Sequence, residues 1–209
     1  MRFIGDRIQE TWRQYREYPQ LNDEVNQHTT MKYRTFVFAA VLSLHAYAQK
    51  AEYVCQPCGG VCDQKVYGSQ GICATCNMPL VEKSTVNFTN LNAKEFCAWI
   101  AANPNALILD VRSTVEFAGS STAVETFGHF KNAVNININQ LANRVGELAK
   151  YKDREILVYC SHSQRSPRAS YYLGLQGFKN VKNLLGGVSS VQQLTKEECF
   201  KKNFVDHSH

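Results

Sequence analysis

The 209-residue sequence lacks three features that would place the protein in a well-defined class. It has no long disordered tract, and its hydrophobic content of 44% is enough for an ordinary core. Its lysines and arginines are scattered and its net charge is only +5, so the basic stripe typical of nucleic-acid binding is absent. It also lacks the roughly 20 consecutive apolar residues of a membrane-spanning helix. We therefore predict one ordinary domain and a smaller one, with no nucleic-acid partner and no stable membrane span.

Cysteine, by contrast, is plentiful, and its distribution is uneven. Five of the eight cysteines fall between residues 55 and 76, and three are spread over the rest of the chain: Cys97, Cys160 and Cys199. This distribution predicts a small cysteine-dependent module followed by a larger domain with few thiols. Cys97 and Cys199 lie in helical apolar patterns, so we expect them to act as apolar filling.

Residues 31–48 have the pattern of a secretory signal peptide. A positively charged start precedes a short apolar core at residues 36–44, and Ala46-Tyr47-Ala48 reads as a small-x-small cleavage site. The pattern predicts an exported protein, periplasmic or secreted, although a buried helix or a signal anchor is the alternative. We expect residues 1–30 to lie upstream of the true start at Met31; a genuine cytosolic head is the rival interpretation.

Residues 49–83 contain two C-x-x-C pairs. The first pair is followed by Gly59 and the second by Asn77, and both residue types accept a left-handed backbone. Such turns curl around a metal ion and aim backbone N–H groups at the thiolates, so two of them supply the four sulfurs of a tetrahedral Zn²⁺ site. We predict a site for Zn²⁺ or another thiophilic metal, with Cys62 as an alternate ligand and four main ligands: Cys55, Cys58, Cys73 and Cys76.

This spacing resembles a zinc ribbon, and the segments Tyr53-x-Cys55 and Gly71-x-Cys73-x-x-Cys76-x-Met78-x-Leu80 resemble a small heavy-metal-binding domain of exported bacterial proteins. The first half departs from that family, because Cys55-Gln-Pro-Cys58 replaces a Cys-Pro-Met-His type of sequence. Disulfides or a redox thiol pair are the alternative in an exported chain. A module this small buries little core, so a bound metal would be required for folding.

Residues 86–209 read as a second domain in which strands and helices alternate. Asn92 and Glu95 form a capping box that begins a helix. Apolar runs predict strands at 106–111, 133–138, 155–159 and 181–185, and helices follow near residues 141, 167 and 188. This alternation predicts a parallel sheet flanked by helices. Sites in such sheets lie at the carboxyl ends of strands, where Cys160 falls.

The segment CSHSQRS after the third strand has the features of an anion-holding loop. A thiol is reactive as the thiolate. Inward backbone N–H groups, the start of the helix at Pro167 and the charge of Arg165 would each favour that anion. We predict Cys160 and Arg165 as catalytic residues, and we expect the rest of the loop to hold a persulfide or another anion: Ser161, His162, Ser163, Gln164 and Ser166.

These residues resemble the active-site loop of rhodanese-family sulfurtransferases. Further motifs of that family have counterparts in order along residues 86–194: Asp110-Val111-Arg112, Gly128-His129-Phe130, Ala133-Val134-Asn135-Ile136, Gly177-Phe178 and Leu185-Gly186-Gly187-Val188. The pair Glu116-Phe117 has a counterpart in the family as well. The resemblance implies a rhodanese-like parallel sheet, with Asp110 and Arg112 as structural support, and we expect Glu116 and His129 to support the loops at the strand ends in the same way. Ser163 and Asn132 stand where the family has glycine, and Asn137 stands where proline is usual.

The resemblance implies an exported sulfurtransferase without a catalytic cofactor. Cys160 would take sulfane sulfur from a small donor such as thiosulfate or a persulfide, hold it as a persulfide, and pass it to a thiol or cyanide acceptor. The competing expectation is a non-catalytic binding or redox-sensing module. Four residues separate Cys160 from Arg165, whereas related cysteine phosphatases have five, so phosphate or arsenate chemistry is disfavoured.

Overall fold

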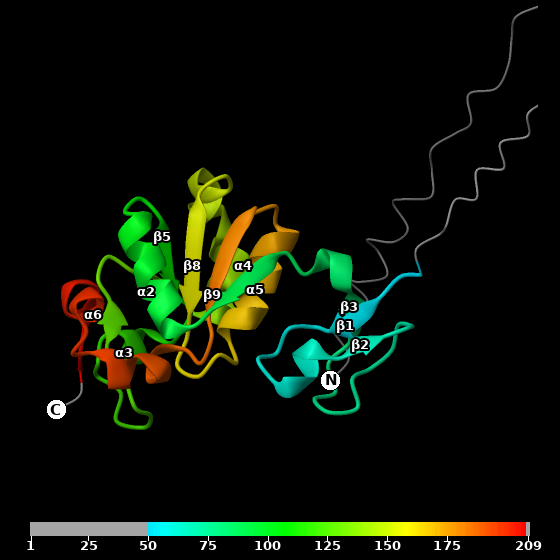
Figure 1. Cartoon of the computed structure of the whole chain (residues 1–209), viewed down its shortest axis with the longest axis horizontal. Coiled ribbons are helices and arrows are strands. Elements are labelled where there is room, and N and C mark those ends of the chain that lie inside the picture. Colours follow the sequence, from blue (N-terminus) through cyan, green and yellow to red (C-terminus); the bar gives the residue numbers. More distant parts are fainter. Residues whose placement is uncertain (1–49, 208–209) are drawn as a thin grey trace, which may run out of the picture. The chain divides into compact units, whose positions relative to one another are not determined.

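The computed structural model describes residues 50–207 (Figure 1). The upstream segment 1–30 and the expected signal peptide at 31–48 lie outside the described residues. Within residues 50–207, no helix has both the length and the apolar content needed to cross a bilayer.

The cysteine-rich module is a small antiparallel sheet built around sulfur. Its strands β1 (Tyr53–Cys55), β2 (Val66–Tyr67) and β3 (Leu80–Glu82) lie in the order β2-β1-β3. A short 3-10 helix, η1 (Val61–Gln64), follows the first C-x-x-C pair. The interior is made almost wholly of cysteines, with two apolar side chains packed against them: Met78 and Leu80. The thiols therefore take the place of an ordinary apolar core.

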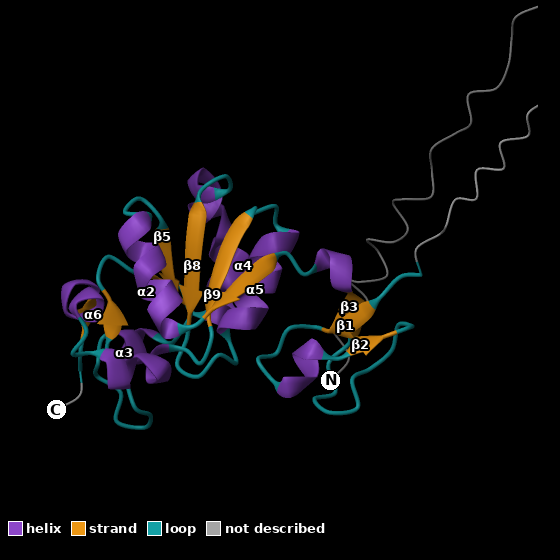
Figure 2. Cartoon of the chain, viewed as in Figure 1, coloured by secondary structure: helices purple, strands orange, loops and turns teal. Residues whose placement is uncertain are grey.

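The larger domain contains a five-stranded parallel sheet in the order β4-β9-β8-β5-β7 (Figure 2). The strands are β4 (Phe88–Leu91), β5 (Leu107–Asp110), β7 (Val134–Asn135), β8 (Glu155–Tyr159) and β9 (Asn180–Leu184). Every pairing in this sheet is parallel. The predicted parallel α/β architecture is confirmed. Strand β4 begins after the short 3-10 helix η2 (Lys83–Thr85).

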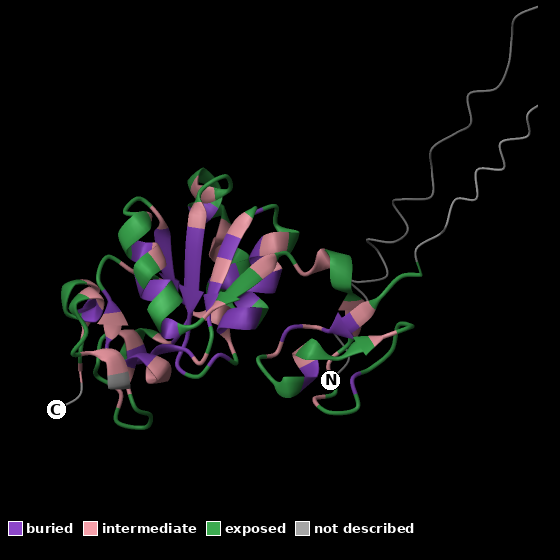
Figure 3. Cartoon of the chain, in the orientation of Figure 1, coloured by how far each residue is buried: buried purple, intermediate pink, exposed green. Residues whose placement is uncertain are grey.

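Helices cover both faces of this sheet and form two apolar layers. One layer joins α2 (Ala93–Ala102) and α6 (Glu198–Asn203) to the sheet, and the other joins α4 (Ile138–Arg144) and α5 (Ser166–Leu175) to it. The central strand β8 is buried over four of its five residues, as the near-continuous apolar run of a two-sided sheet requires (Figure 3). The capping box expected at Asn92 is present, since its side chain accepts the N–H of Glu95.

Two local predictions were wrong in extent. The strand expected at 133–138 is only β7, because the Asn137 side chain accepts the N–H of Asn139 and begins α4. The 3-10 helix η3 (Val145–Tyr151) then continues the chain. The helix expected at 188–199 is a 3-10 segment, η4 (Val188–Leu194), followed by α6.

An antiparallel pair outside the main sheet also escaped prediction. The short helix α3 (Thr114–Phe117) leads through a loop to β6 (His129–Phe130), which pairs with β10 (Phe204–Val205). Phe130 of β6 packs its ring against those of four other aromatic residues: Phe96, Tyr159, Phe200 and Phe204. The C-terminal segment is therefore part of the core.

Cys97 and Cys199 form a disulfide, which corrects their assignment as apolar filling. The bond joins α2 to α6, with 6.1 Å between the Cα atoms and a sequence separation of 102. Both helices pack on the same face of the sheet, so their inward stripes bring the two thiols together. Helical periodicity placed both cysteines on inward faces of helices but could not show that they pair.

Replacing both cysteines with alanine should lower the free energy of unfolding by about 3 kcal/mol, because the disulfide closes a long loop and restricts the unfolded chain. Urea unfolding of the oxidised wild type and of the Cys97→Ala/Cys199→Ala variant would measure the difference. Reduced wild type should resemble the variant. Equal midpoints for oxidised and reduced wild type would show that the bond contributes nothing.

Candidate functional site

Cys160 directly follows β8 at the carboxyl edge of the sheet. The residue is 1% exposed, and its Sγ lies 3.3 Å from the Ser166 hydroxyl at the start of α5. A hydroxyl at this distance can donate a hydrogen bond to the sulfur. The thiol is therefore enclosed between the end of a central strand and the first turn of a helix.

The turn after β9 fixes the backbone of the Cys160 loop. The N–H groups of Val188 and Ser189 donate to the carbonyls of Cys160 and Ser161 at 2.8 and 3.0 Å. Gly187 has a φ of +65°, and a Cβ built there would lie 2.3 Å from the Ser161 carbonyl oxygen. Only glycine allows this close approach, which accounts for the Gly-Gly motif seen in the sequence.

Ser163 adopts the left-handed conformation that glycine favours, with a φ of +62°. A serine at such an angle costs on the order of 1 kcal/mol relative to glycine. Its hydroxyl compensates by donating to the Leu184 carbonyl at 3.3 Å. The loop can therefore adopt its conformation although Ser163 stands where the family has glycine. The neighbouring His162 and Gln164 side chains are exposed, and the His162 ring lies edge-on to Phe127.

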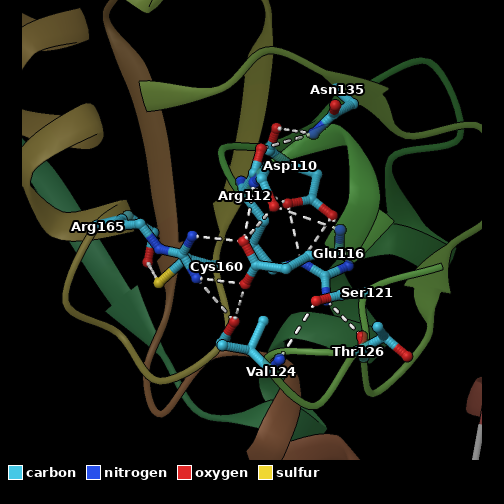
Figure 4. Close-up of polar contacts among 12 residues, drawn as sticks. Asp110, Arg112, Glu116, Ser121, Val124, Thr126, Asn135, Cys160 and Arg165 are labelled. Atoms are coloured by element: carbon cyan, nitrogen blue, oxygen red, sulfur yellow. Dashed lines mark hydrogen bonds and ion pairs between the residues drawn. The ribbon is translucent and has the colours of Figure 1, made fainter. Parts of the chain in front are cut away.

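Arg165 is held by a carboxylate rather than left free beside the sulfur. Its guanidinium makes two 2.7 Å hydrogen bonds to Glu116, and its Nη2 also donates to the Ser161 hydroxyl at 2.8 Å (Figure 4). Ser161 in turn donates to Glu116 Oε1 at 2.9 Å. The three side chains form a closed network that joins α3 to both ends of the Cys160 loop.

Glu116 was expected only as a support, and it is the centre of this network. Burial alone would raise its pKa, but hydrogen bonds from Arg165 and Ser113 outweigh burial and hold the pKa of this carboxyl far below its ordinary value. Ser113 and Glu116 form a capping box on α3, and this S-x-x-E pattern was the sequence signal for a fixed carboxylate.

Asp110 and Arg112 form a fully buried ion pair beside the loop. Arg112 donates from Nε and Nη2 to the Asp110 carboxylate, with a shortest distance of 2.7 Å. Its remaining donors reach the carbonyls of Thr126 and Gly128. The Asn135 side chain donates to the carbonyls of Asp110 and Arg112. These contacts tie the ends of β5 and β7 to the segment before β6.

The second cluster of chemical groups lies in the cysteine-rich module. Four sulfurs lie within 4.8 Å of one another, and they belong to Cys55, Cys58, Cys62 and Cys76. Cys62, predicted only as an alternate ligand, is therefore a member of this quartet. Cys73, predicted as a main ligand, is buried beside it with its Sγ 3.8 Å from the Tyr67 hydroxyl.

The turns after both C-x-x-C pairs have the left-handed residues that the sequence suggested. Gly59 has a φ of +80° and Asn77 a φ of +57°. Backbone N–H groups of Cys76 and Thr75 donate to the Cys73 sulfur and lower the pKa of this thiol to about 6. Burial raises the pKa of Cys58 to about 12. Cysteine binds a metal ion as the thiolate. A thiophilic cation would therefore suit the sulfur ligands of this cluster.

The fold and the Cys160 loop define a parallel α/β domain with a thiol at the end of a central strand. The profile of the rhodanese-like domain family matches residues 92–194. The chain therefore contains a rhodanese-like domain, as the motifs suggested. A rhodanese-related protein from Thermoplasma volcanium is 26% identical over 50% of this chain and 92% of its own, with a TM-score of 0.41.

The curated relatives carry a more specific name. A tRNA uridine(34) hydroxylase from Buchnera aphidicola is 33% identical over 104 residues, and one from Hamiltonella defensa is 31% identical over 107 residues. These matches cover 48% and 49% of this chain. The chain spans only 30% and 28% of those relatives.

These names contradict the expected activity of an exported thiosulfate or persulfide sulfurtransferase. The matching relatives are named for a reaction on tRNA, which also weighs against the prediction of no nucleic-acid partner. The loop motif identified a thiol-bearing fold, and a fold of this kind does not determine the substrate.

Glu116→Gln should destabilise the protein by roughly 2–3 kcal/mol, because Arg165 loses the charge that compensates its partial burial. The Glu116 pKa is depressed, so its stabilisation is complete above the ordinary glutamate pKa and is lost as the pH falls. Urea unfolding at neutral and acidic pH should therefore show a smaller acid-induced loss in the variant than in the wild type.

Glu147→Gln is the matched control, because Glu147 forms a similar bidentate pair with Arg144 on the exposed surface. Exposed pairs of this kind contribute little to stability. If the two variants behave alike, the Glu116 network has no special structural role.

Proposed function

We propose that the rhodanese-like domain is an enzyme that works by covalent catalysis at Cys160. The observation that carries this proposal is the position of the thiol in a loop fixed on both sides, by Glu116 through Arg165 and by the turn at Gly187. A rigid loop of this kind keeps a nucleophile in one orientation and reduces the entropy lost on reaching the transition state.

The chemistry follows from the groups around the sulfur. The Cys160 thiol releases its proton to water, and the thiolate attacks an electrophilic atom of the substrate to form a covalent bond while the leaving group departs with its electron pair. Ser166 can donate a hydrogen bond to the thiolate at the 3.3 Å separation. A second nucleophile then displaces the group from Sγ and regenerates the thiolate. Because Cys160 is almost fully enclosed, the reacting part of the substrate must be small or extended.

A second candidate concerns the substrate and is favoured by the curated relatives. Their shared name places uridine 34 of tRNA as the group acted on, and their likeness to this chain lies in the part that contains Cys160. The chain covers less than a third of those relatives, so most of their length has no counterpart in the match.

The Cys160→Ser variant should distinguish these ideas from a non-catalytic role. Wild-type protein isolated from its native host should carry a covalent adduct on Cys160 in peptide mass spectra, and the variant should carry none. Incubation of each protein with tRNA, in the presence of molecular oxygen as the oxidant that hydroxylation requires, followed by nucleoside mass spectrometry, tests the second candidate: hydroxylated uridine 34 should form with wild type alone. A wild type without adduct or product in either arm would contradict catalysis.

We further propose that the module at residues 49–83 binds a thiophilic cation such as Zn²⁺. The convergence of four sulfurs within 4.8 Å and the scarcity of other core residues support this role. The cation would replace the missing apolar interior as the source of folding energy. The metal titration in the next subsection tests this role.

We also propose that the chain is exported. The signal-like pattern at residues 31–48 and the Cys97–Cys199 disulfide both support an oxidising compartment. In fractionated bacterial cells, the full chain should be found outside the cytoplasm with this disulfide formed. A chain lacking residues 31–48 should stay inside with both thiols reduced. Full chain retained in the cytoplasm would contradict export and would favour the tRNA candidate.

A further inference from the structure

The cysteine-rich module contains one thiol more than a single tetrahedral ion can bind. A structural Zn²⁺ takes four ligands, and four sulfurs already lie within 4.8 Å of one another. The fifth thiol, Cys73, is 1% exposed and belongs to the same buried cluster of cysteines. All five thiols of the module therefore converge on one place, and one zinc ion leaves one of them without a metal bond.

Cys62 is built into this cluster rather than left at its margin. It is 4% exposed, whereas Val61 beside it on η1 is 87% exposed. Hydrophobic burial would favour the opposite arrangement, because valine gains more than a polar thiol from leaving water. The Asp63 carboxylate accepts the N–H groups of Cys58 and Gly59 at 3.0 and 2.7 Å, which fixes η1 against the first C-x-x-C turn. The inward position of the sulfur is thus specified by the fold.

The number of sulfurs is enough for two ions that share a ligand. Cys55 and Cys76 lie 3.1 Å apart and Cys58 and Cys62 lie 3.5 Å apart, so the quartet consists of two close pairs, and Cys73 is the fifth thiol of the same cluster. Cu(I) binds two or three thiolates, and one thiolate can bridge two Cu(I) ions. Two three-coordinate ions need six metal–sulfur bonds, which five thiolates supply when one of them bridges.

We propose that the five cysteines form a two-ion site for Cu(I), with Cys62 as a required ligand of the second ion. Thiolate sulfur is the ligand type that selects Cu(I). The inference rests on the proposed metal-binding role of the module and specifies its capacity and preferred cation. Zn²⁺ occupies the same sulfurs as a single ion.

An anaerobic titration of the full chain with Cu(I), in competition with a chromophoric Cu(I) chelator, tests the stoichiometry. The parent protein carries Cys160→Ser so that this thiol cannot bind copper, and the Cys97–Cys199 disulfide is kept intact and verified by mass. The parent should bind two Cu(I) or one Zn²⁺ per chain. Adding Cys62→Ser should reduce the copper capacity to one and leave one Zn²⁺, while Val61→Ser on the same helix should leave both capacities unchanged.

X-ray absorption of the loaded parent should show a Cu–Cu distance, which two separate sites would not give. A parent that binds only one Cu(I), or a Cys62→Ser variant that still binds two, would overturn the two-ion site. One Zn²⁺ with only one Cu(I) would preserve the general metal role while removing this inference. If the parent binds neither metal, the metal role of the module fails as well.

Discussion

The geometry around Cys160 depends on one buried carboxylate. Glu116 accepts hydrogen bonds from Arg165, Ser161 and Ser113, so a single side chain on α3 determines the position of both sides of the loop. Glu116 neutralises the charge of Arg165. The Arg165 side chain therefore affects the site mainly by holding the backbone of the loop in place. The loop therefore differs from a simple cationic cradle: its rigidity comes from an ion pair beside the sulfur.

The two parts of the chain stabilise their folds by different means. The rhodanese-like domain buries continuous apolar strands between helical layers, which is ordinary hydrophobic stabilisation. The module at residues 53–82 has almost no apolar interior and relies on sulfur. The first part would keep its fold in the absence of metal, whereas the second has little besides its thiols to oppose the loss of chain entropy.

Patterns that act over short distances were readable in the sequence. The apolar runs predicted strands β5, β8 and β9, the Asn92–Glu95 box predicted the start of α2, and the motif order predicted the rhodanese-like fold. Contacts between distant segments were not readable. The Cys97–Cys199 bond and the pairing of β6 with β10 depend on the packing of the final residues, which no local pattern encodes.

The candidate site shows the same difference between local patterns, which the sequence predicted, and contacts between distant residues, which it did not. Cys160 and its loop were identified because the strand, the thiol and the arginine are adjacent in sequence. The role of Glu116 was underestimated because its partner Arg165 lies 49 residues away. Cys62 was ranked below Cys73 because C-x-x-C spacing reflects turn geometry, whereas membership of the quartet depends on how η1 folds back.

The tight fit at Gly187 has a mechanical consequence. The N–H groups of Val188 and Ser189 donate hydrogen bonds to carbonyls of the Cys160 loop, and the backbone at Gly187 is too close to this loop for a Cβ atom to fit between them. This loop and η4 can therefore move only as a unit. Val188 and Val191 on η4 are fully enclosed in the layer that contains α2. Any substrate that widens the loop must therefore displace part of that layer, and tolerance for bulky substrates is governed by side chains remote from the sulfur.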